Sequence, residues 1–327
     1  MDTANVEEVK QLISCLPQET IDLAFAYGSG AMPQTSSDLK NNMVDFIVAV
    51  SDAEAFHREN LKRNRRHYSA IKYFGAIANA NFQRKYAAHV FYNTLVKTEN
   101  GREIKYGLIE TGHLIADLLD WDYLYVSGRL HKPTLRLTEP KSMELESALD
   151  VNLKSAVHAA LLLLPESFTL EQLFTKISSI SYQGDFRSTV GEDRNKVAKI
   201  VKANMSRFDA LYKPYLAANE RVVVNGQRVE QDGSTTAVYH HLNLLPSAVL
   251  WRLQESVNRR QMWNRDLEEV IFSLAHRRDY STAVYSAINS IVRHSSRTQS
   301  VKNIVTAGVW KTTVYALRKL GKMARSM

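Results

Sequence analysis

One stretch restricts the possible folds more than any other: two apolar segments, residues 24–27 and 43–50, joined through a small-residue turn and a polar loop. Both segments are typical of β-strands, and Gly28-Ser29-Gly30 after the first predicts a tight turn. Glycine lets a ligand approach the backbone closely, and successive amides in such a turn can bind phosphate oxygens. Asp45 interrupts the second apolar segment. A carboxylate there is costly to bury without a partner, and a metal ion is a common one.

A Gly-Ser turn followed by a strand-borne aspartate is the layout of nucleotidyltransferases, in which the turn holds a triphosphate and the aspartate holds Mg²⁺. The turn alone is a weak signal, so the prediction depends on Asp45. The general pattern has another carboxylate two residues earlier, where this chain has Met43. The metal site must therefore hold a single ion or be completed elsewhere. Asp185 is the best candidate, which would place the site between two domains, and Asp38 and Asp117 are weaker ones.

Longer motifs extend this pattern over nearly the whole chain. The relevant positions are Tyr27-Gly28-Ser29-Gly30, Gln34, Met43-Val44-Asp45-Phe46, His57, Asn60, Asn64, His67-Tyr68-Ser69, Tyr92-Asn93-Thr94, Lys105-Tyr106-Gly107, Trp121, residues 128–133, residues 182–187, Asn264-Arg265-Asp266 and Thr306-Ala307-Gly308. With them the chain resembles the mitochondrial CDP-diacylglycerol synthases of the translocator-assembly-and-maintenance type, which are peripheral phosphatidate cytidylyltransferases. The resemblance implies CTP and phosphatidate as substrates, Mg²⁺ as cofactor, and a location on the matrix side of the mitochondrial inner membrane, feeding cardiolipin synthesis. The preference for CTP rests on the resemblance alone.

The phosphate of phosphatidate is already anionic, so attack on the α-phosphorus of CTP needs charge neutralisation and in-line placement more than a general base. We therefore expect a structural role for His67, and we expect carboxylates and cations to make up the site. The predicted catalytic residues are Asp45, Asp185, Lys132 and Arg187, with Asp45 and Asp185 as metal ligands; the predicted nucleotide-binding residues are Tyr27, Gly28, Ser29, Gly30, Lys105 and Arg129. For any single cation, a solvated side chain is the alternative.

Hydrophobic periodicity predicts an α+β fold in three parts. Residues 1–135 form a nucleotidyltransferase-like α/β domain, 136–230 a helical winged-helix-like domain, and 231–327 a helical C-terminal region. Among the predicted elements are a helix capped by Ser51 and Glu54, a helix over residues 68–78, strands over residues 89–95, 103–108 and 123–126, and helices over residues 145–164, 169–180, 192–211 and 281–292.

The net charge of +8 is concentrated at the C-terminus, where no acidic residue follows Asp279. A basic amphipathic helix over residues 309–324 is expected to lie on an anionic membrane surface, through Trp310, Lys311, Arg318 and Lys322. A terminal helix packed on the protein body is the alternative, and no nucleic-acid partner is expected because interleaved aromatic residues are lacking. No apolar run is long enough to span a membrane, and the acidic N-terminus is unlike a cleavable presequence.

Two rival functions stay open: a nucleotidyltransferase that acts on RNA or protein, and a catalytically inactive lipid-binding scaffold, given Met43. The sequence leaves the oligomeric state open.

Overall fold

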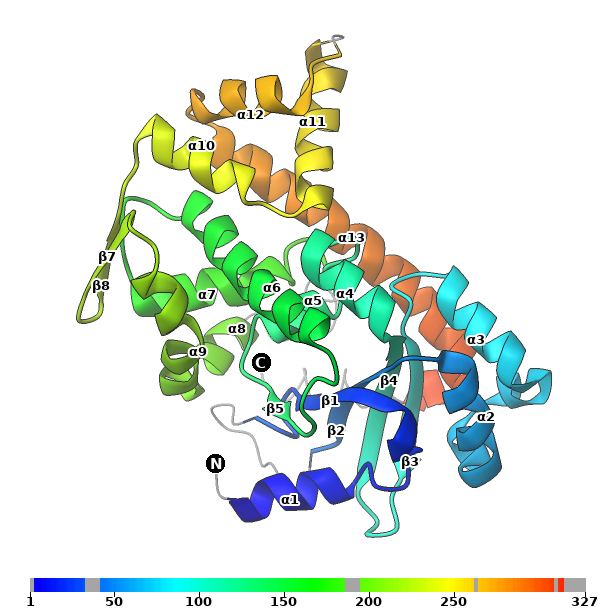
Figure 1. Cartoon of the computed structure of the whole chain (residues 1–327). Helices are drawn as coiled ribbons and strands as arrows, with labels where there is room; N and C mark the ends of the chain where they lie inside the picture. Colours follow the sequence, from blue (N-terminus) through cyan, green and yellow to red (C-terminus); the bar gives the residue numbers. More distant parts are fainter. Residues whose placement is uncertain (1–2, 33–41, 186–194, 262–263, 309–310, 315–327) are drawn as a thin grey trace.

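The computed structural model describes residues 3–32, 42–185, 195–261, 264–308 and 311–314. The fold is α+β, with a mixed sheet and many helices (Figure 1). Five strands form the main sheet in the order β3-β4-β2-β1-β5. The strands are β1 (Ile21–Tyr27), β2 (Val44–Val50), β3 (Phe91–Lys97), β4 (Glu103–Glu110) and β5 (Leu135–Arg136). β2 and β4 are parallel and the other pairs are antiparallel, so the sheet is mixed.

Apolar side chains alternate between the two faces of this sheet and form a core on each. On one face Phe46, Phe91 and Tyr106 belong to a core that continues into the helices α1 (Thr3–Gln11), α2 (Ala53–Arg63) and α3 (Gly75–Lys85). On the other face Ile47 and Tyr92 belong to a core with α4 (Thr111–Asp120) and α6 (Met143–Leu162). Burial on both faces explains why the central strands are apolar throughout.

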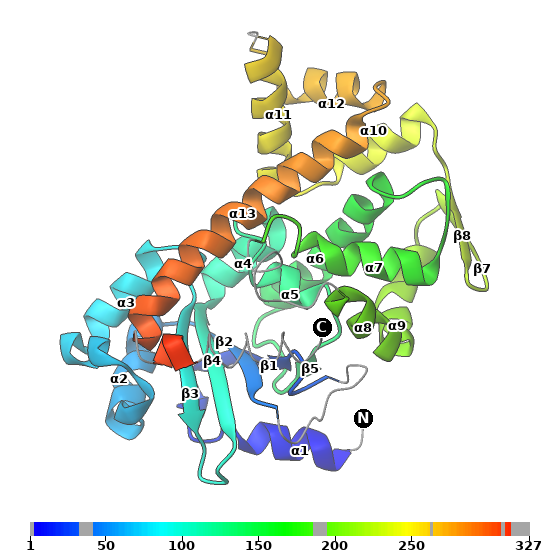
Figure 2. The same ribbon diagram turned by 180° about the vertical axis from the view of Figure 1, so that it is seen from behind.

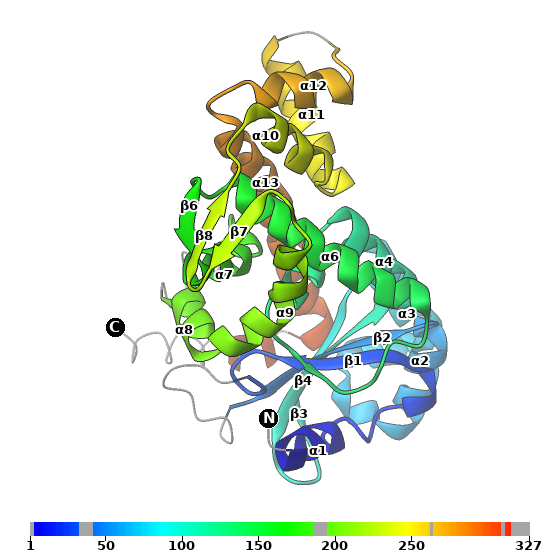
Figure 3. The ribbon, with the colours of Figure 1, turned by 60° about the vertical axis from the view of Figure 1, so that its left-hand side comes forward.

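The remaining helices pack around a third core, which runs from Trp121 to Val292. They are α7 (Leu170–Ile180), α8 (Lys196–Ala203), α9 (Met205–Ala217), α10 (Thr235–Asn243), α11 (Ser247–Gln261), α12 (Leu267–Ala275) and α13 (Tyr280–Ala307). The short helix α5 (Ser127–Leu130) contacts α4 and α6 instead. A small sheet of β6 (Ser167–Thr169), β8 (Arg228–Gln231) and β7 (Val222–Asn225) lies at the edge of these helices, on the side of the molecule away from α3 (Figure 3). The predicted capping pair of α7 is confirmed, since Thr169 and Gln172 form a reciprocal capping box.

The predicted helix over residues 281–292 was too short. α13 continues to Ala307 and runs diagonally from the helical part to the side of α3 (Figure 2). Beyond Val292 its buried side chains are polar as far as Thr306, including Ser295, Gln299 and Lys302, so the apolar periodicity that marks a helix is absent.

The predicted strand over residues 123–126 is wrong. The carboxylate of Asp117 accepts hydrogen bonds from the amides of Tyr123 and Val126, each at 3.0 Å, and these bonds fold the segment into a compact turn. Trp121 takes a left-handed backbone conformation just before it, with φ of 57°.

Three predicted helices have different limits. The N-cap of α2 is Asp52 and not Ser51, because the Asp52 carboxylate accepts the Glu54 amide. The segment 68–78 consists of the 3₁₀ helix η3 (Ala70–Phe74) and the start of α3. The helix expected over residues 192–211 is divided at Asn204 into α8 and α9, and residues 192–194 lie outside the described residues.

Candidate active site

Three strands bring Tyr27, Asp45 and Lys105 side by side. Asp45 of β2 lies opposite Tyr27 of β1 and opposite Lys105 of β4 in the sheet register. Residues opposite each other in neighbouring strands project from the same face, so the three side chains share one face. The Lys105 ammonium lies 3.6 Å from Oδ1 of Asp45, and both side chains are largely buried. The end of the sheet therefore carries a carboxylate and a cation in contact.

The turn after β1 lies directly against Asp45. Gly28 has φ of +76°, which favours glycine, and a Cβ there would be 3.6 Å from Oδ2 of Asp45. Gly30 is required for a different reason, since a Cβ there would be 2.3 Å from the Met43 carbonyl oxygen. Both glycines let this turn approach the start of β2.

The turn and Asp45 open into a cavity of about 240 Å³. Its walls come from the sheet end, the α5 region, the end of α7, α8 and α13. The polar and charged lining residues are Tyr27, Ser29, Asp45, Lys105, Tyr125, Arg129, Lys132, Ser181, Tyr182, Asp185, Lys196, Asn204, Ser295 and Ser296, and Gly28 also contributes. Most of the predicted site residues thus meet in one cavity. Gly30 lies behind its wall, and Arg187 lies outside the described residues.

Aromatic rings hold two of the cations in place. The Arg129 guanidinium lies 3.9 Å from the centre of the Tyr125 ring and 5.3 Å from that of Tyr27. The Lys105 ammonium lies 4.4 Å from the centre of the Tyr92 ring. Burial raises the pKa of Tyr92 well above its usual range, so the ring stays neutral and offers its negative face to the cation. Both cations are therefore positioned before any ligand binds.

Lys132 joins the two walls of the cavity. Its ammonium donates to the Gly128 carbonyl in α5 and, at 2.9 Å, to Oγ of Ser181 just after α7. A Cβ at Gly128 would lie 2.4 Å from the Ser181 Cβ, so glycine permits this close approach. Lys196 at the start of α8 lies over the same Tyr182 ring as Lys132, each at 5.1 Å. The sequence interpretation missed Lys196, which no motif marks.

Asp185 reaches the cavity from the other wall. It follows Gly184, whose φ is +82° and whose added Cβ would lie 2.6 Å from the Asn289 carbonyl oxygen of α13. The Asp185 side chain is buried and lines the same cavity as Asp45. Asp117, the weaker alternative, does not line it, and its carboxylate is used by the amides of the turn that leads to α5.

The donor set suits a magnesium ion that binds together with a substrate. Oδ1 of Asp45 is buried and accepts no hydrogen bond from the residues that the structure describes. Within those same residues no group of three or more His, Cys, Asp or Glu side chains is placed to hold a metal. Mg²⁺ commonly binds through one or two carboxylates, waters and substrate phosphates, so Asp45 and Asp185 fit this mode and a closed protein site does not.

Comparison with known proteins identifies the family. A family model described as mitochondrial phosphatidate cytidylyltransferase matches residues 9–322. The chain belongs to this family. A phosphatidate cytidylyltransferase of Caenorhabditis elegans is 47% identical over 322 residues, which cover 98% of this chain and all of the relative. The Xenopus laevis protein of the same name is 44% identical over 325 residues (98% of this chain, 95% of the relative). The Homo sapiens protein is 45% identical over 306 residues (91% and 66%). The resemblance read from the motifs is therefore confirmed.

Other motif residues of this cytidylyltransferase family member lie on the opposite face of the sheet. The Tyr106 hydroxyl accepts from the side-chain amides of Asn60 and Asn93, both at 2.8 Å, and lies 3.1 Å from Nδ1 of His67. His57 bonds the Tyr68 hydroxyl through Nδ1 and Gln83 through Nε2. Burial lowers the pKa of His57 to about 4, so its ring is neutral. These side chains bond one another, and none of them lines the cavity.

The predicted membrane-binding residues are only partly described. Lys311 donates to the His67 carbonyl at 3.4 Å, and residues 311–314 are helical. Trp310, Arg318 and Lys322 lie outside the described residues.

Proposed function

We propose that the chain transfers the cytidylyl group of CTP to phosphatidate. An oxygen of the phosphatidate phosphate attacks the α-phosphorus of CTP, the new P–O bond forms as the bond to the β-phosphate oxygen breaks, and pyrophosphate leaves with CDP-diacylglycerol as the other product. The attacking oxygen is anionic, so the site has no proton to remove. The observation that carries this proposal is Asp45, whose carboxylate lies between the glycine turn and Lys105 and whose buried Oδ1 accepts no hydrogen bond from the described residues.

The cavity supplies what this reaction requires, because two phosphate-bearing substrates must meet there. Lys105, Arg129, Lys132 and Lys196 all line the cavity and offset the repulsion between them. The Gly28-Ser29 turn binds the triphosphate, while Asp45 and Asp185 hold Mg²⁺. Mg²⁺ held there would supply positive charge to the phosphates, beside the charge that Lys105 and Arg129 supply. Aromatic contacts fix the directions of Lys105 and Arg129, so little reorganisation is needed as charge develops.

The location we propose is the matrix side of the mitochondrial inner membrane, where the product would feed cardiolipin synthesis. The relatives are named mitochondrial, which supports the organelle. No helix among residues 3–308, apart from the undescribed gaps, is long and apolar enough to cross a bilayer. The C-terminal basic segment with Trp310, Lys311, Arg318 and Lys322 is proposed to contact the anionic surface. Removing residues 309–327 should weaken binding to anionic vesicles and leave CTP binding intact, whereas undiminished vesicle binding would contradict this role.

The decisive experiment follows label from CTP into lipid with purified protein, Mg²⁺ and phosphatidate-containing vesicles. The protein should transfer the label, and Asp45→Ala should not. Asp150→Asn is the matched control, since Asp150 is a carboxylate paired with Lys154 on α6 outside the cavity, and it should retain activity. CTP binding without transfer to lipid would point to an RNA or protein acceptor. A protein that binds vesicles but no CTP would be a scaffold, and the proposal would fail.

A further inference from the structure

Two stretches of the chain contain no acidic residue, and they are far apart in the sequence. Residues 60–98 and 280–327 each hold eight Lys or Arg residues and no Asp or Glu. Because the whole chain carries only +8, the rest of the molecule is net negative. The first stretch contains η3 and α3, and the second contains α13. The reaction proposed above uses none of these basic residues.

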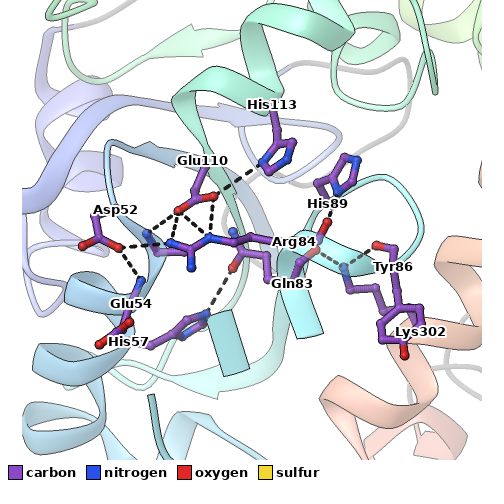
Figure 4. Close-up of polar contacts among 11 residues, drawn as sticks. Asp52, Glu54, His57, Gln83, Arg84, Tyr86, His89, Glu110, His113 and Lys302 are labelled. Carbon is purple, nitrogen blue, oxygen red and sulfur yellow. Dashed lines mark hydrogen bonds and ion pairs between the residues drawn. The ribbon is translucent and has the colours of Figure 1, made fainter. Parts of the chain in front are cut away.

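The fold places the two stretches against each other. The buried Lys302 ammonium of α13 donates to the carbonyls of Gln83 at 2.9 Å and Tyr86 at 2.7 Å, at the end of α3 (Figure 4). One turn farther on, the Ser69 hydroxyl donates to the Val305 carbonyl at 3.4 Å. The last turns of α13 are thereby fixed beside η3 and α3, so the described parts of the two stretches adjoin there. We name this region the η3–α13 face.

Large apolar side chains are exposed on this face. Tyr73, Phe74 and Ile77, at the junction of η3 and α3, are 73%, 75% and 60% exposed. Val301 and Val305, one turn apart on α13, are also exposed. Single exposed apolar residues are ordinary, but a group of them on adjoining elements marks an interaction site.

Basic residues of the first stretch lie on the same part of the chain as these apolar side chains. Three basic residues of the first stretch are engaged elsewhere: Lys62 pairs with Glu59, Arg63 with Glu19, and Arg84 with Glu110 (Figure 4). In contrast, Arg65, Arg66, Lys72 and Lys85 form no ion pair with any residue that the structure describes. Arg65 and Lys72 instead lie over the ring of Tyr73, at 5.7 Å and 5.4 Å from its centre. The face therefore offers apolar side chains within a field of positive charge.

We propose that the η3–α13 face docks on an anionic lipid bilayer. Phe74, Ile77 and Tyr73 enter the boundary between headgroups and acyl chains, and Arg65, Arg66, Lys72 and Lys85 bind the lipid phosphates. Three of the five exposed apolar side chains, those of Ile77, Val301 and Val305, are aliphatic; they suit the acyl chains of a lipid and offer no ring on which a nucleic-acid base could stack. This contact is separate from the C-terminal segment after residue 308.

The position of the face also connects the bilayer to the cavity. Val292, Ser295 and Ser296 of α13 line the cavity. Val301 and Val305 lie on the same helix, about 8 Å and about 14 Å beyond Ser296 at a rise of about 1.5 Å per residue. A docked face would hold the cavity close to the lipid surface from which phosphatidate comes. This last point rests on the proposed function, whereas docking itself does not.

The test measures binding of the full chain to vesicles made of equal parts phosphatidylcholine and phosphatidylglycerol, which contain no substrate. Phe74→Ser/Ile77→Ser should weaken binding by at least about tenfold, since two largely exposed apolar side chains no longer enter the bilayer. The matched control is Trp251→Ser/Phe272→Ser, which changes side chains 53% and 60% exposed on α11 and α12, and it should bind as the unchanged protein does. Lys72→Gln/Lys85→Gln should weaken binding and reduce its dependence on salt.

Three results would overturn the proposal: absence of binding by the unchanged protein, equal binding by Phe74→Ser/Ile77→Ser, or an equal loss in the control. The proposal would also fail if the Phe74→Ser/Ile77→Ser variant lost binding to a single-stranded RNA while its binding to vesicles stayed unchanged. Cytidylyl transfer to a short-chain, water-soluble phosphatidate distinguishes a failure of membrane docking from a failure of the proposed reaction. The variant should retain that transfer and lose transfer to vesicle phosphatidate, whereas a failure of the reaction itself would abolish both in the unchanged protein.

Discussion

The two faces of the main sheet use polar residues in opposite ways. On one face Asp45, Lys105 and Arg129 surround a cavity, and a buried oxygen of Asp45 accepts no hydrogen bond from the described residues. On the other face Asn60 and Tyr106 belong to a buried network in which side chains bond mainly one another. Both groups lie within motifs of the same family. An unpartnered polar atom alone does not separate the faces, since Asn93 Oδ1 in the network also has no hydrogen-bond partner among the described residues. A motif residue is therefore assigned to the site when it lines the cavity, and to the framework when it does not and other side chains bond it.

The largest effect should follow from replacing Asp45 with Asn. This change keeps the shape and removes the charge that would hold Mg²⁺, so cytidylyl transfer should fall by at least about a hundredfold. The free energy of unfolding should change by less than about 1 kcal/mol, because Oδ1 of Asp45 accepts no hydrogen bond from the described residues and lies as far as 3.6 Å from the Lys105 ammonium. Transfer assays and urea unfolding measure the two quantities. A large loss of stability would mean that Asp45 is a framework residue, and the contrast between the faces would disappear.

A smaller loss of activity is expected for Lys105→Met. The substitution removes one of several cations around the phosphates, so kcat/KM should fall by about ten- to a hundredfold. Because the ammonium lies 3.6 Å from Asp45, the effects of the two substitutions on kcat/KM should not be additive. Lys105→Met should lower kcat/KM less in the Asp45→Asn protein than in the unchanged protein. Steady-state kinetics of the two single variants and the double variant test this coupling. Full additivity would show that the two side chains act on separate groups.

The sequence alone was enough to predict the part of the site that comes from segments close together in the chain. Asp45 and the Gly28 turn are brought together by the pairing of β1 with β2, and their order in the sequence already indicates a phosphate and metal site. Asp185 was predicted only through a longer motif, because its approach depends on Gly184 packing against Asn289 of α13. Lys196 and Ser295 carry no local signal, since they reach the cavity through the packing of α8 and α13 on the rest of the molecule.

The incorrect predictions of secondary structure have a related origin, since they depend on side-chain hydrogen bonds that periodicity does not detect. The strand predicted over residues 123–126 fails because the Asp117 carboxylate bonds the amides that a strand would offer to a neighbour. The second half of α13 could not be predicted because its buried Gln299 and Lys302 bond backbone carbonyls, that of Val90 just before β3 and that of Gln83 in α3. Periodicity detects apolar burial, so a helix with a polar buried face is not recognised.

On the network face, Tyr106→Phe should affect stability and spare the chemistry. The lost hydroxyl leaves the buried amide of Asn93 without this acceptor and leaves that of Asn60 with only the Tyr68 hydroxyl, which should cost about 1–3 kcal/mol of unfolding free energy. Transfer per folded molecule should change little. Tyr73→Phe, at an exposed position, is the control and should change stability by less than about 0.5 kcal/mol. Loss of transfer at unchanged stability would assign the network to the active site.

The smallest effect concerns pH, and it should also belong to the network face. Burial lowers the pKa of His57 to about 4 from its usual value near 6.5, so between these pH values the unfolded chain binds the proton and the folded chain does not. The stability from this group is therefore present above pH 6.5 and is lost as the pH falls toward 4, by at most about 1.4 kcal/mol per pH unit. Urea unfolding measured between pH 7 and pH 5 should show that the unfolding free energy depends less steeply on pH in His57→Gln. The test compares these slopes, so a lower stability of the variant at pH 7, from lost bonds to Tyr68 and Gln83, does not affect it. Asp45→Asn should keep the original slope because it leaves the histidine in place. If Asp45→Asn flattened the slope as much as His57→Gln does, the two faces would be coupled, and the division between site and framework would have to be abandoned.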